Sequence, residues 1–273
     1  MRSFLAALFS LVAIVAAAIA VPAFWVNSNL VDRDGFSSMV SPLADNPKVQ
    51  EHIADEITVQ VAASAPLVPE ALIRPLADAY TRSDDFELDF TEAMNQQHDW
   101  LFKEATPEDE GQVMSLDLTP MVNRIVDDGI FSGIEVTGPI EVPLSDSAAA
   151  GLEAGRYHDL GDQIGYIAFG ALVIAVVAAI GALVVARRRG LVLAAVGFGV
   201  LLGGVLTWLL GDFAERRALD EVSGAEGSAR EVAELIIDEV ADSMQRIGLI
   251  AAVAGVVLAV VGVVVSAMLE RRR

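Results

Sequence analysis

The segment "LVVARRRGLVLA", residues 183–194, places three consecutive arginines between two long apolar runs. The chain of 273 residues is 54% hydrophobic and has a positive mean hydropathy, which is too apolar for a soluble domain of this length. Four runs without a charged residue each reach the roughly 20 residues that span a hydrocarbon core about 30 Å thick. They cover residues 3–31, 163–186, 190–211 and 247–269. The sequence therefore predicts a mainly α fold built on a four-helix transmembrane bundle.

The distribution of charge predicts how these helices are oriented, because arginine and lysine in short loops mark the cytoplasmic side of a membrane. With four alternating spans, one side carries seven arginines and a single acid, Glu270. On the other side, residues 27–162 carry 7 basic and 27 acidic residues, and residues 212–246 carry 4 and 10. We therefore expect a multi-pass plasma-membrane protein whose arginine triplet and termini are cytoplasmic. The seven arginines are Arg2, Arg187, Arg188, Arg189, Arg271, Arg272 and Arg273.

These features divide the chain into predicted segments. Transmembrane helices are expected at 1–29, 163–186, 190–211 and 247–269, a cytoplasmic turn at 187–189, a cytoplasmic tail at 270–273, an extracytoplasmic domain at 30–162 and an extracytoplasmic helical hairpin at 212–246. The first span has an alternative, because "AIA" at residues 18–20 fits a signal-peptidase site. We favour a retained helix, since the apolar run continues to Val26 and ends with Phe24 and Trp25, which are typical interfacial anchors.

Small residues in the third and fourth runs predict close helix packing. Gly248, Gly255 and Gly262 are seven apart and therefore lie close to one helical face. In the third run a small residue recurs at every fourth position, including Gly199 and Gly203. Such ladders let helix backbones approach closely in lipid. We assign these five glycines to packing; the alternative is that they line a pore or form a hinge.

The four apolar runs contain no Asp, Glu, Lys, Arg or His. Proton relays and ion pathways depend on such groups facing the interior of the bundle, and transporter sites are often marked by Gly/Pro-broken repeats in matching halves, which this sequence lacks. The sequence therefore disfavours an ion-coupled transporter. A lipid-handling groove or a channel formed by an oligomer stays open.

Residues 30–162 are predicted to form a mostly helical domain with minor β structure. Asn46 as N-cap and Pro47 begin a helix whose apolar residues recur every fourth position from Val49 to Val61. Residues 133–144 alternate apolar and polar side chains around a Gly-Pro turn, which predicts a small ribbon. Further helices are expected at 69–80, at 84–103 and from Thr119.

The second extracytoplasmic segment leads into the fourth span as a protruding helix. Ser228 and Glu231 have the spacing of a capping box. The helix then carries an apolar stripe, which needs a partner. That partner is either the large extracytoplasmic domain or a separate protein. The stripe consists of Val232, Leu235, Ile236 and Val240.

The sequence offers no strong catalytic constellation. Cysteine is absent, which excludes disulfides, thiolate nucleophiles and cysteine-based zinc sites. His98 lies on a strong helical pattern beside Asp99, but no second histidine stands at ligand spacing and no motif frames a nucleophile. We interpret His98 as a histidine at the edge of the core, and His52 and His158 are weaker candidates still.

Residues 32–36, "DRDGF", resemble the start of a calcium loop. However, Gly35 comes fourth rather than sixth, and Leu43 stands at the twelfth position, where an acid is required. The acidic runs at 84–92 and 108–110 are interpreted as solvated faces. We therefore predict no metal, no cofactor and no catalytic residue, and the net charge of −20 disfavours binding to nucleic acid.

Three segments carry a resemblance to a known family: "LVDRDGFSSMVSPLADNPKVQEHIADEIT" at 30–58, "DFTEAMNQQHDWLF" at 89–102 and "SLDLTPMVNRI" at 115–125. Together with a first span and three C-terminal spans, they resemble a family of actinobacterial integral membrane proteins that has no assigned activity. The resemblance covers nearly the whole chain and is most specific at 30–58. It implies a plasma-membrane protein with an extracytoplasmic domain.

These observations favour a non-enzymatic accessory or scaffold protein embedded in the lipid bilayer. Its acidic extracytoplasmic domain is expected to bind an envelope membrane protein, or a second copy of the chain. Two alternatives are a lipid-handling transporter or oligomeric channel, and an extracytoplasmic ligand sensor.

Overall fold

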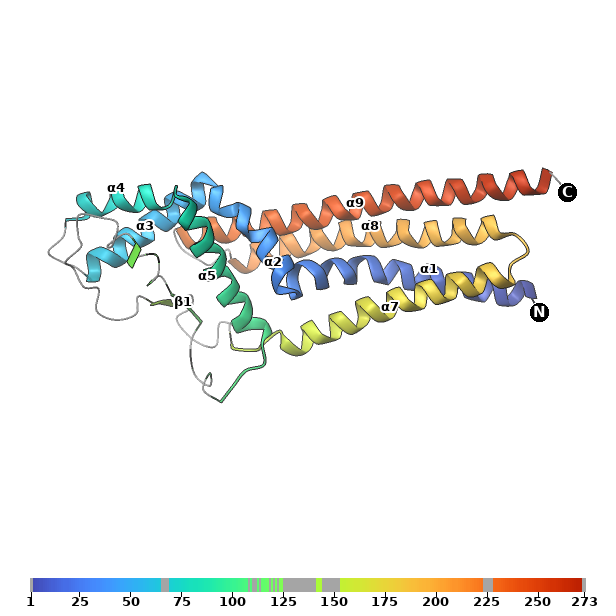
Figure 1. Ribbon diagram of the computed structural model, residues 1–273, viewed down its shortest axis with the longest axis horizontal. Coiled ribbons are helices and arrows are strands. Elements are labelled where there is room, and N and C mark those ends of the chain that lie inside the picture. Colours follow the sequence, from blue (N-terminus) through green and yellow to red (C-terminus); the bar gives the residue numbers. More distant parts are fainter. Residues whose placement is uncertain are drawn as a thin grey trace. The chain divides into compact units, whose positions relative to one another are not determined.

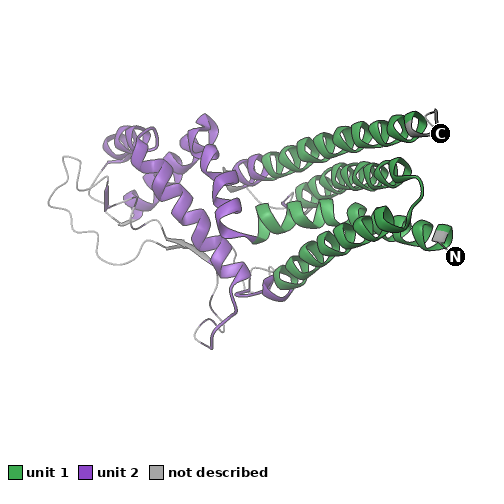
Figure 2. Ribbon diagram, turned by 45° about the vertical axis from the view of Figure 1, so that its right-hand side comes forward, with its two compact units in different colours: residues 1–31, 160–221, 237–273 green, residues 32–159, 222–236 purple. Residues whose placement is uncertain are grey.

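The computed structural model describes residues 2–64, 69–107, 109, 112, 114–117, 119, 121, 123–124, 141–143, 153–222 and 228–271. By their internal contacts the residues form two compact units, which have separate colours in Figure 2. The span unit comprises Met1–Val31, Leu160–Glu221 and Ile237–Arg273. The acidic unit comprises Asp32–Asp159 and Val222–Ile236. Each unit has its own internal packing.

Long apolar helices build the span unit (Figure 1). All four contain a stretch long and apolar enough to cross a membrane, as the sequence predicts. Only 17% of the most apolar part of α9 is buried inside the protein, so most of its surface is left for lipid. The chain is thus a multi-pass membrane protein. The elements are α1 (Arg2–Val26), which continues into a π-helical turn η1 (Asn27–Val31), α7 (His158–Val185), α8 (Arg189–Val222) and α9 (Ser228–Arg271).

Glycines bring the antiparallel helices α8 and α9 into backbone contact. A methyl group added to Gly248 would lie 2.8 Å from the carbonyl oxygen of Gly204, a separation that real Cβ atoms essentially never show. The same holds along the whole seam, where glycines seven residues apart on α8 face glycines seven residues apart on α9. The facing pairs are Gly190 with Gly262, Gly197 with Gly255, and Gly204 with Gly248.

A second seam joins α8 to α1. A methyl group on Gly199 would lie 2.9 Å from the carbonyl oxygen of Ile14, and one on Gly203 would lie 3.1 Å from that of Ala17. The five glycines assigned to packing from the sequence therefore all lie at helix contacts, but at two different interfaces between helices. Gly199 and Gly203 contact α1, whereas Gly248, Gly255 and Gly262 contact α8.

Shorter helices build the acidic unit. The N–H of Lys48 donates to Oδ1 of Asn46 at 3.0 Å, which confirms the predicted N-cap of α3. Thr119 and Met121 are helical, in the place where a helix is expected, and residues 223–227 at the tip of the expected hairpin lie outside the described residues. The helices are α2 (Arg33–Val40), the 3₁₀ turn η2 (Ser41–Asp45), α3 (Pro47–Ser64), α4 (Glu70–Tyr80) and α5 (Asp84–Phe102), joined by the first turns of α9.

The core of the acidic unit is an apolar cluster formed by α2 to α5. Phe86, Phe90 and Ala93 are buried along one face of α5, with the spacing that an amphipathic helix requires. The predicted apolar face of α3 is confirmed, because Val49 and Ile57 are completely buried in the same cluster. Burying each of these large side chains contributes about 1.5–3 kcal/mol to folding.

Among the described residues, strands are limited to β1 (Ser115–Asp117) and β2 (Glu141–Pro143), which pair antiparallel with Leu116 opposite Val142. A ladder of this length cannot form a sheet with its own core. The fold is therefore mainly α, and a β component of the domain beyond this three-residue pair is not supported within the described residues. The ribbon expected at 133–144 lies largely outside the described residues, and its described part, β2, pairs with β1.

Candidate interaction site

The first turns of α9 pack on the core of the acidic unit. Leu235 and Ile236 are partly buried against the apolar cluster that contains Phe86 and Phe90. Val232 belongs to the same unit and is half-buried, whereas Val240 belongs to the span unit. The stripe that the sequence offers to a partner is thus partly covered by the chain's own acidic unit. This packing reduces the part of the stripe that another protein could contact.

The polar surface of the acidic unit has a net negative charge, because acids outnumber bases in it and several of the bases already pair with carboxylates. Four of the seven basic residues in 27–162 form ion pairs with acids of the same unit. Arg33, for example, lies 3.4 Å from a carboxylate oxygen of Glu92 and 3.5 Å from one of Asp99. These pairs engage six of the 27 acids and leave a large excess of negative charge. Besides Arg33, the paired bases are Arg74 with Asp55 and Asp78, Lys103 with Asp99, and Arg124 with Asp85 and Asp89.

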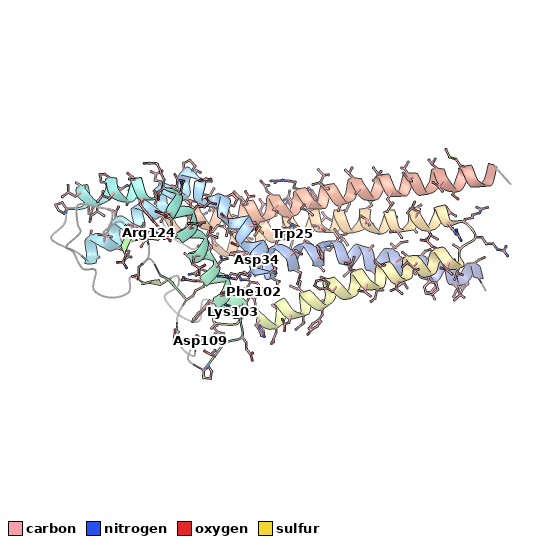
Figure 3. All side chains as sticks on the ribbon, viewed as in Figure 1. Trp25, Asp34, Phe102, Lys103, Asp109 and Arg124 are labelled. Atoms are coloured by element: carbon pink, nitrogen blue, oxygen red, sulfur yellow. The ribbon has the colours of Figure 1, made fainter. Side chains whose placement is uncertain are left out.

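The carboxylate of Asp89 in α5 forms hydrogen bonds with side chains of two other segments, Tyr80 of α4 and Arg124. Its Oδ2 accepts a hydrogen bond from the hydroxyl of Tyr80 at 2.8 Å and another from Nε of Arg124 at 2.6 Å, while its Oδ1 accepts from a second nitrogen of Arg124 at 3.1 Å. The Asp89 side chain is only 11% exposed. Burial, and then the hydrogen bond to Asp89, raise the pKa of Tyr80 above its ordinary value. The hydrogen bond to Asp89 likewise raises the pKa of the Arg124 guanidinium, and Arg124 is labelled in Figure 3.

His98 is a packing residue of the acidic unit. Its ring lies between those of Phe36 and Phe102, with centroid distances of 4.8 and 4.7 Å, and the residue is 5% exposed. Phe102 stands at the end of α5, next to Lys103 (Figure 3). Nδ1 of His98 lies 3.9 Å from Oδ1 of Asp99. This geometry supports the interpretation of His98 as a core histidine.

The other candidates for metal chemistry are the calcium-like segment at 32–36, His158 and His52. Asp32 caps α2, since its Oδ1 accepts the N–H of Gly35 at 3.0 Å, so the calcium-like segment is a helix N-terminus. His158 at the start of α7 has its Nδ1 3.1 Å from the carbonyl oxygen of Phe102, and His52 is half-buried on α3. Within the part of the chain that the structure describes, no three His, Cys, Asp or Glu side chains are grouped as a metal would need.

The arginine triplet lies where α7 gives way to α8. Arg187 and Arg188 are in the connection between these helices, and Arg189 is the first residue of α8. All three are exposed. Long charged side chains at the ends of membrane spans can extend into the polar interface, so arginines can be accommodated at these positions.

Two sets of residues escape sequence reasoning. Gly190, Gly197 and Gly204 form the α8 side of the seam, and their spacing of seven matches that on α9, so the signal is present in the sequence. The contacts of Asp89 with Tyr80 and Arg124 have no comparable signal, because Arg124 comes 35 residues after Asp89.

Comparisons with protein-family models, with curated proteins and with solved structures return no match.

Proposed function

We propose that this protein is a non-enzymatic accessory component of the plasma membrane, whose acidic unit faces outward and binds a cationic surface of an envelope partner. The observation that carries the proposal is the charge of the acidic unit. Acids outnumber bases by 27 to 7 in residues 27–162, and bases such as Arg33 and Arg124 already pair with carboxylates of the unit, so an excess of acids is available to a basic partner. Complementary charge of this kind speeds encounter and selects partners.

Cross-linking in cells tests this proposal. The full-length tagged chain is cross-linked, extracted in detergent and analysed by mass spectrometry for proteins that co-purify. We expect one basic envelope protein in near-stoichiometric amount, with a recovery that falls as salt rises, because salt screens exposed charges beyond about 10 Å at 0.1 M.

Charge variants sharpen the experiment. Glu51→Gln combined with Asp84→Asn removes two exposed charges from α3 and α5, and we expect recovery of the partner to fall several-fold. The matched control, Glu51→Asp with Asp84→Glu, keeps both charges and should leave recovery unchanged. Recovery that is insensitive to salt and equal in both variants would contradict a charge-based interaction.

A second candidate function is a sensor, and the continuity of α9 favours it. This single helix of 44 residues contributes Leu235 and Ile236 to the core of the acidic unit and then runs on into the span unit. A ligand that changes the packing of the acidic unit would therefore act on the same helix that crosses the membrane. Inserting two glycines after Ile237 should abolish signalling by a sensor but leave partner recovery by an accessory protein intact.

A further inference from the structure

A groove in the span unit opens beside the arginine triplet. It has a volume of about 460 Å³ and is bounded by α1, the end of α7 and the first turns of α8. Volumes in this range are typical of sites that hold a small molecule or part of a larger one. All of its lining residues belong to the span unit.

The lining combines two kinds of chemistry. Ala6 and Ala7 of α1 and Leu191 of α8 supply an apolar wall, and Ser10 adds a hydroxyl group. Arg187 and Arg188 supply two guanidinium groups, and the described residues of the lining include no Asp or Glu. A ligand that matches both parts carries a negative charge next to a hydrocarbon chain.

The position of the groove limits the source of that ligand. The arginines lie at the ends of two spans, which is the depth at which lipid phosphates occur, whereas the alanines and Leu191 belong to apolar helix segments. Basic pockets between transmembrane helices are a recurrent way of binding anionic lipid headgroups. Arginine also suits phosphate because its planar group can donate two parallel hydrogen bonds.

We propose that this groove binds an anionic phospholipid from the adjacent leaflet, with its phosphate at Arg187 and Arg188 and an acyl chain against Ala6, Ala7 and Leu191. This site is independent of the proposed partner of the acidic unit. A lipid held here ties the turn between α7 and α8 to α1.

Native mass spectrometry of the full-length chain in detergent tests the site. The protein is titrated with phosphatidylglycerol and, separately, with phosphatidylcholine that has the same acyl chains. We expect phosphatidylglycerol to bind more tightly, and Arg187→Gln with Arg188→Gln to weaken its binding by about 5-fold for each arginine removed. The control Arg216→Gln with Arg217→Gln removes the same charge from two exposed positions near the other end of α8 and should change binding little.

A second pair of variants tests the apolar wall without altering charge. Ala7→Phe places a ring in the groove and should weaken binding of phosphatidylglycerol, whereas Ala254→Phe, at an exposed position of α9, should not. The proposal is overturned if the two phospholipids bind equally, or if the two arginine pairs have equal effects. It is also overturned if inorganic phosphate at millimolar concentration displaces the lipid, because the site would then recognise a free anion.

Discussion

The hydroxyl of Tyr80 and the carboxylate of Asp89 make the clearest test at the scale of single residues. Tyr80→Phe removes the 2.8 Å hydrogen bond but keeps the ring, which packs edge-on against Phe86 with centroids 5.7 Å apart. We expect the free energy of unfolding to fall by about 1 kcal/mol, or more if the Asp89 carboxylate is left with an unfilled acceptor site. Thermal unfolding of the purified chain followed by circular dichroism measures this change. An unaltered stability would show that the bond is offset by solvation.

The same tyrosine predicts a dependence on alkaline pH. Because burial raises the pKa of Tyr80 in the folded protein, the unfolded chain loses its phenolic proton first as pH rises. Stability contributed by this group is therefore complete below the ordinary tyrosine pKa near 10 and declines above it. Unfolding measured between about pH 9 and 11 should show a steeper loss of stability for the native chain than for Tyr80→Phe. Equal slopes would indicate that Tyr80 titrates normally.

Residue contacts of this kind are where sequence reasoning is weakest. The pairing of Asp89 with Arg124 depends on how α5 meets a segment 35 residues away, and no periodicity along the chain encodes it. By contrast, the cap at Asn46 and the buried face of α3 are local properties, set by one turn of helix or by a period of 3.6 residues. The sequence therefore indicates what each helix buries but not which charged side chains will meet.

At the scale of elements, the seam between α8 and α9 predicts a strong effect of one methyl group. In Gly197→Ala the added carbon would overlap the backbone of Ala259, so the helices must separate along part of the seam. A methyl group on Gly170 of α7 meets nothing within 4 Å. Alanine favours a helix over glycine by about 1 kcal/mol, so Gly170→Ala should be neutral or stabilising while Gly197→Ala destabilises. Unfolding in a denaturing detergent compares the stabilities of the two variants. Equal stabilities would mean that close contact along the seam does not stabilise the protein.

The seam also shows what the sequence hides at this scale. Hydropathy identifies the spans, because a helix in lipid must be apolar over an uninterrupted run of consecutive residues, and such a run is visible in the sequence. Small residues then indicate close packing, but not which neighbour they approach. Gly199 and Gly203 lie against α1, whereas Gly190, Gly197 and Gly204, spaced seven residues apart, lie against α9. The choice of neighbour depends on how four helices assemble, which no single helix specifies.

The start of α9 supports a further prediction for elements. Leu235→Asp places a charge against the apolar cluster of the acidic unit, so we expect the first turns of α9 to detach from that cluster. Hydrogen exchange of the backbone amides of α3 and α5 should then become faster. Val59→Asp is the control, since Val59 is 58% exposed on α3 and its replacement should leave exchange unchanged. Unchanged exchange in Leu235→Asp would mean that the packing of α9 does not stabilise the unit.

At the scale of the whole molecule, the two units differ in the charge of their loops. Three arginines lie where α7 gives way to α8, whereas residues 27–162 carry 27 acids against 7 bases. The charge content of each unit follows from its surroundings. Helices that face lipid exclude ionisable groups, and a helical domain in water can present many acids on its surface.

This asymmetry predicts an orientation that labelling can measure. The chain has no cysteine, so one introduced cysteine is the sole site for a maleimide reagent. Gln96→Cys lies at an exposed position of α5, and Arg189→Cys lies at the start of α8. Because positive charge is retained on the cytoplasmic side, a membrane-impermeant maleimide should label the first variant in intact cells and the second only after permeabilisation. The reverse pattern would place the acidic unit inside the cell, and labelling of both in intact cells would mean that α7 does not cross the membrane.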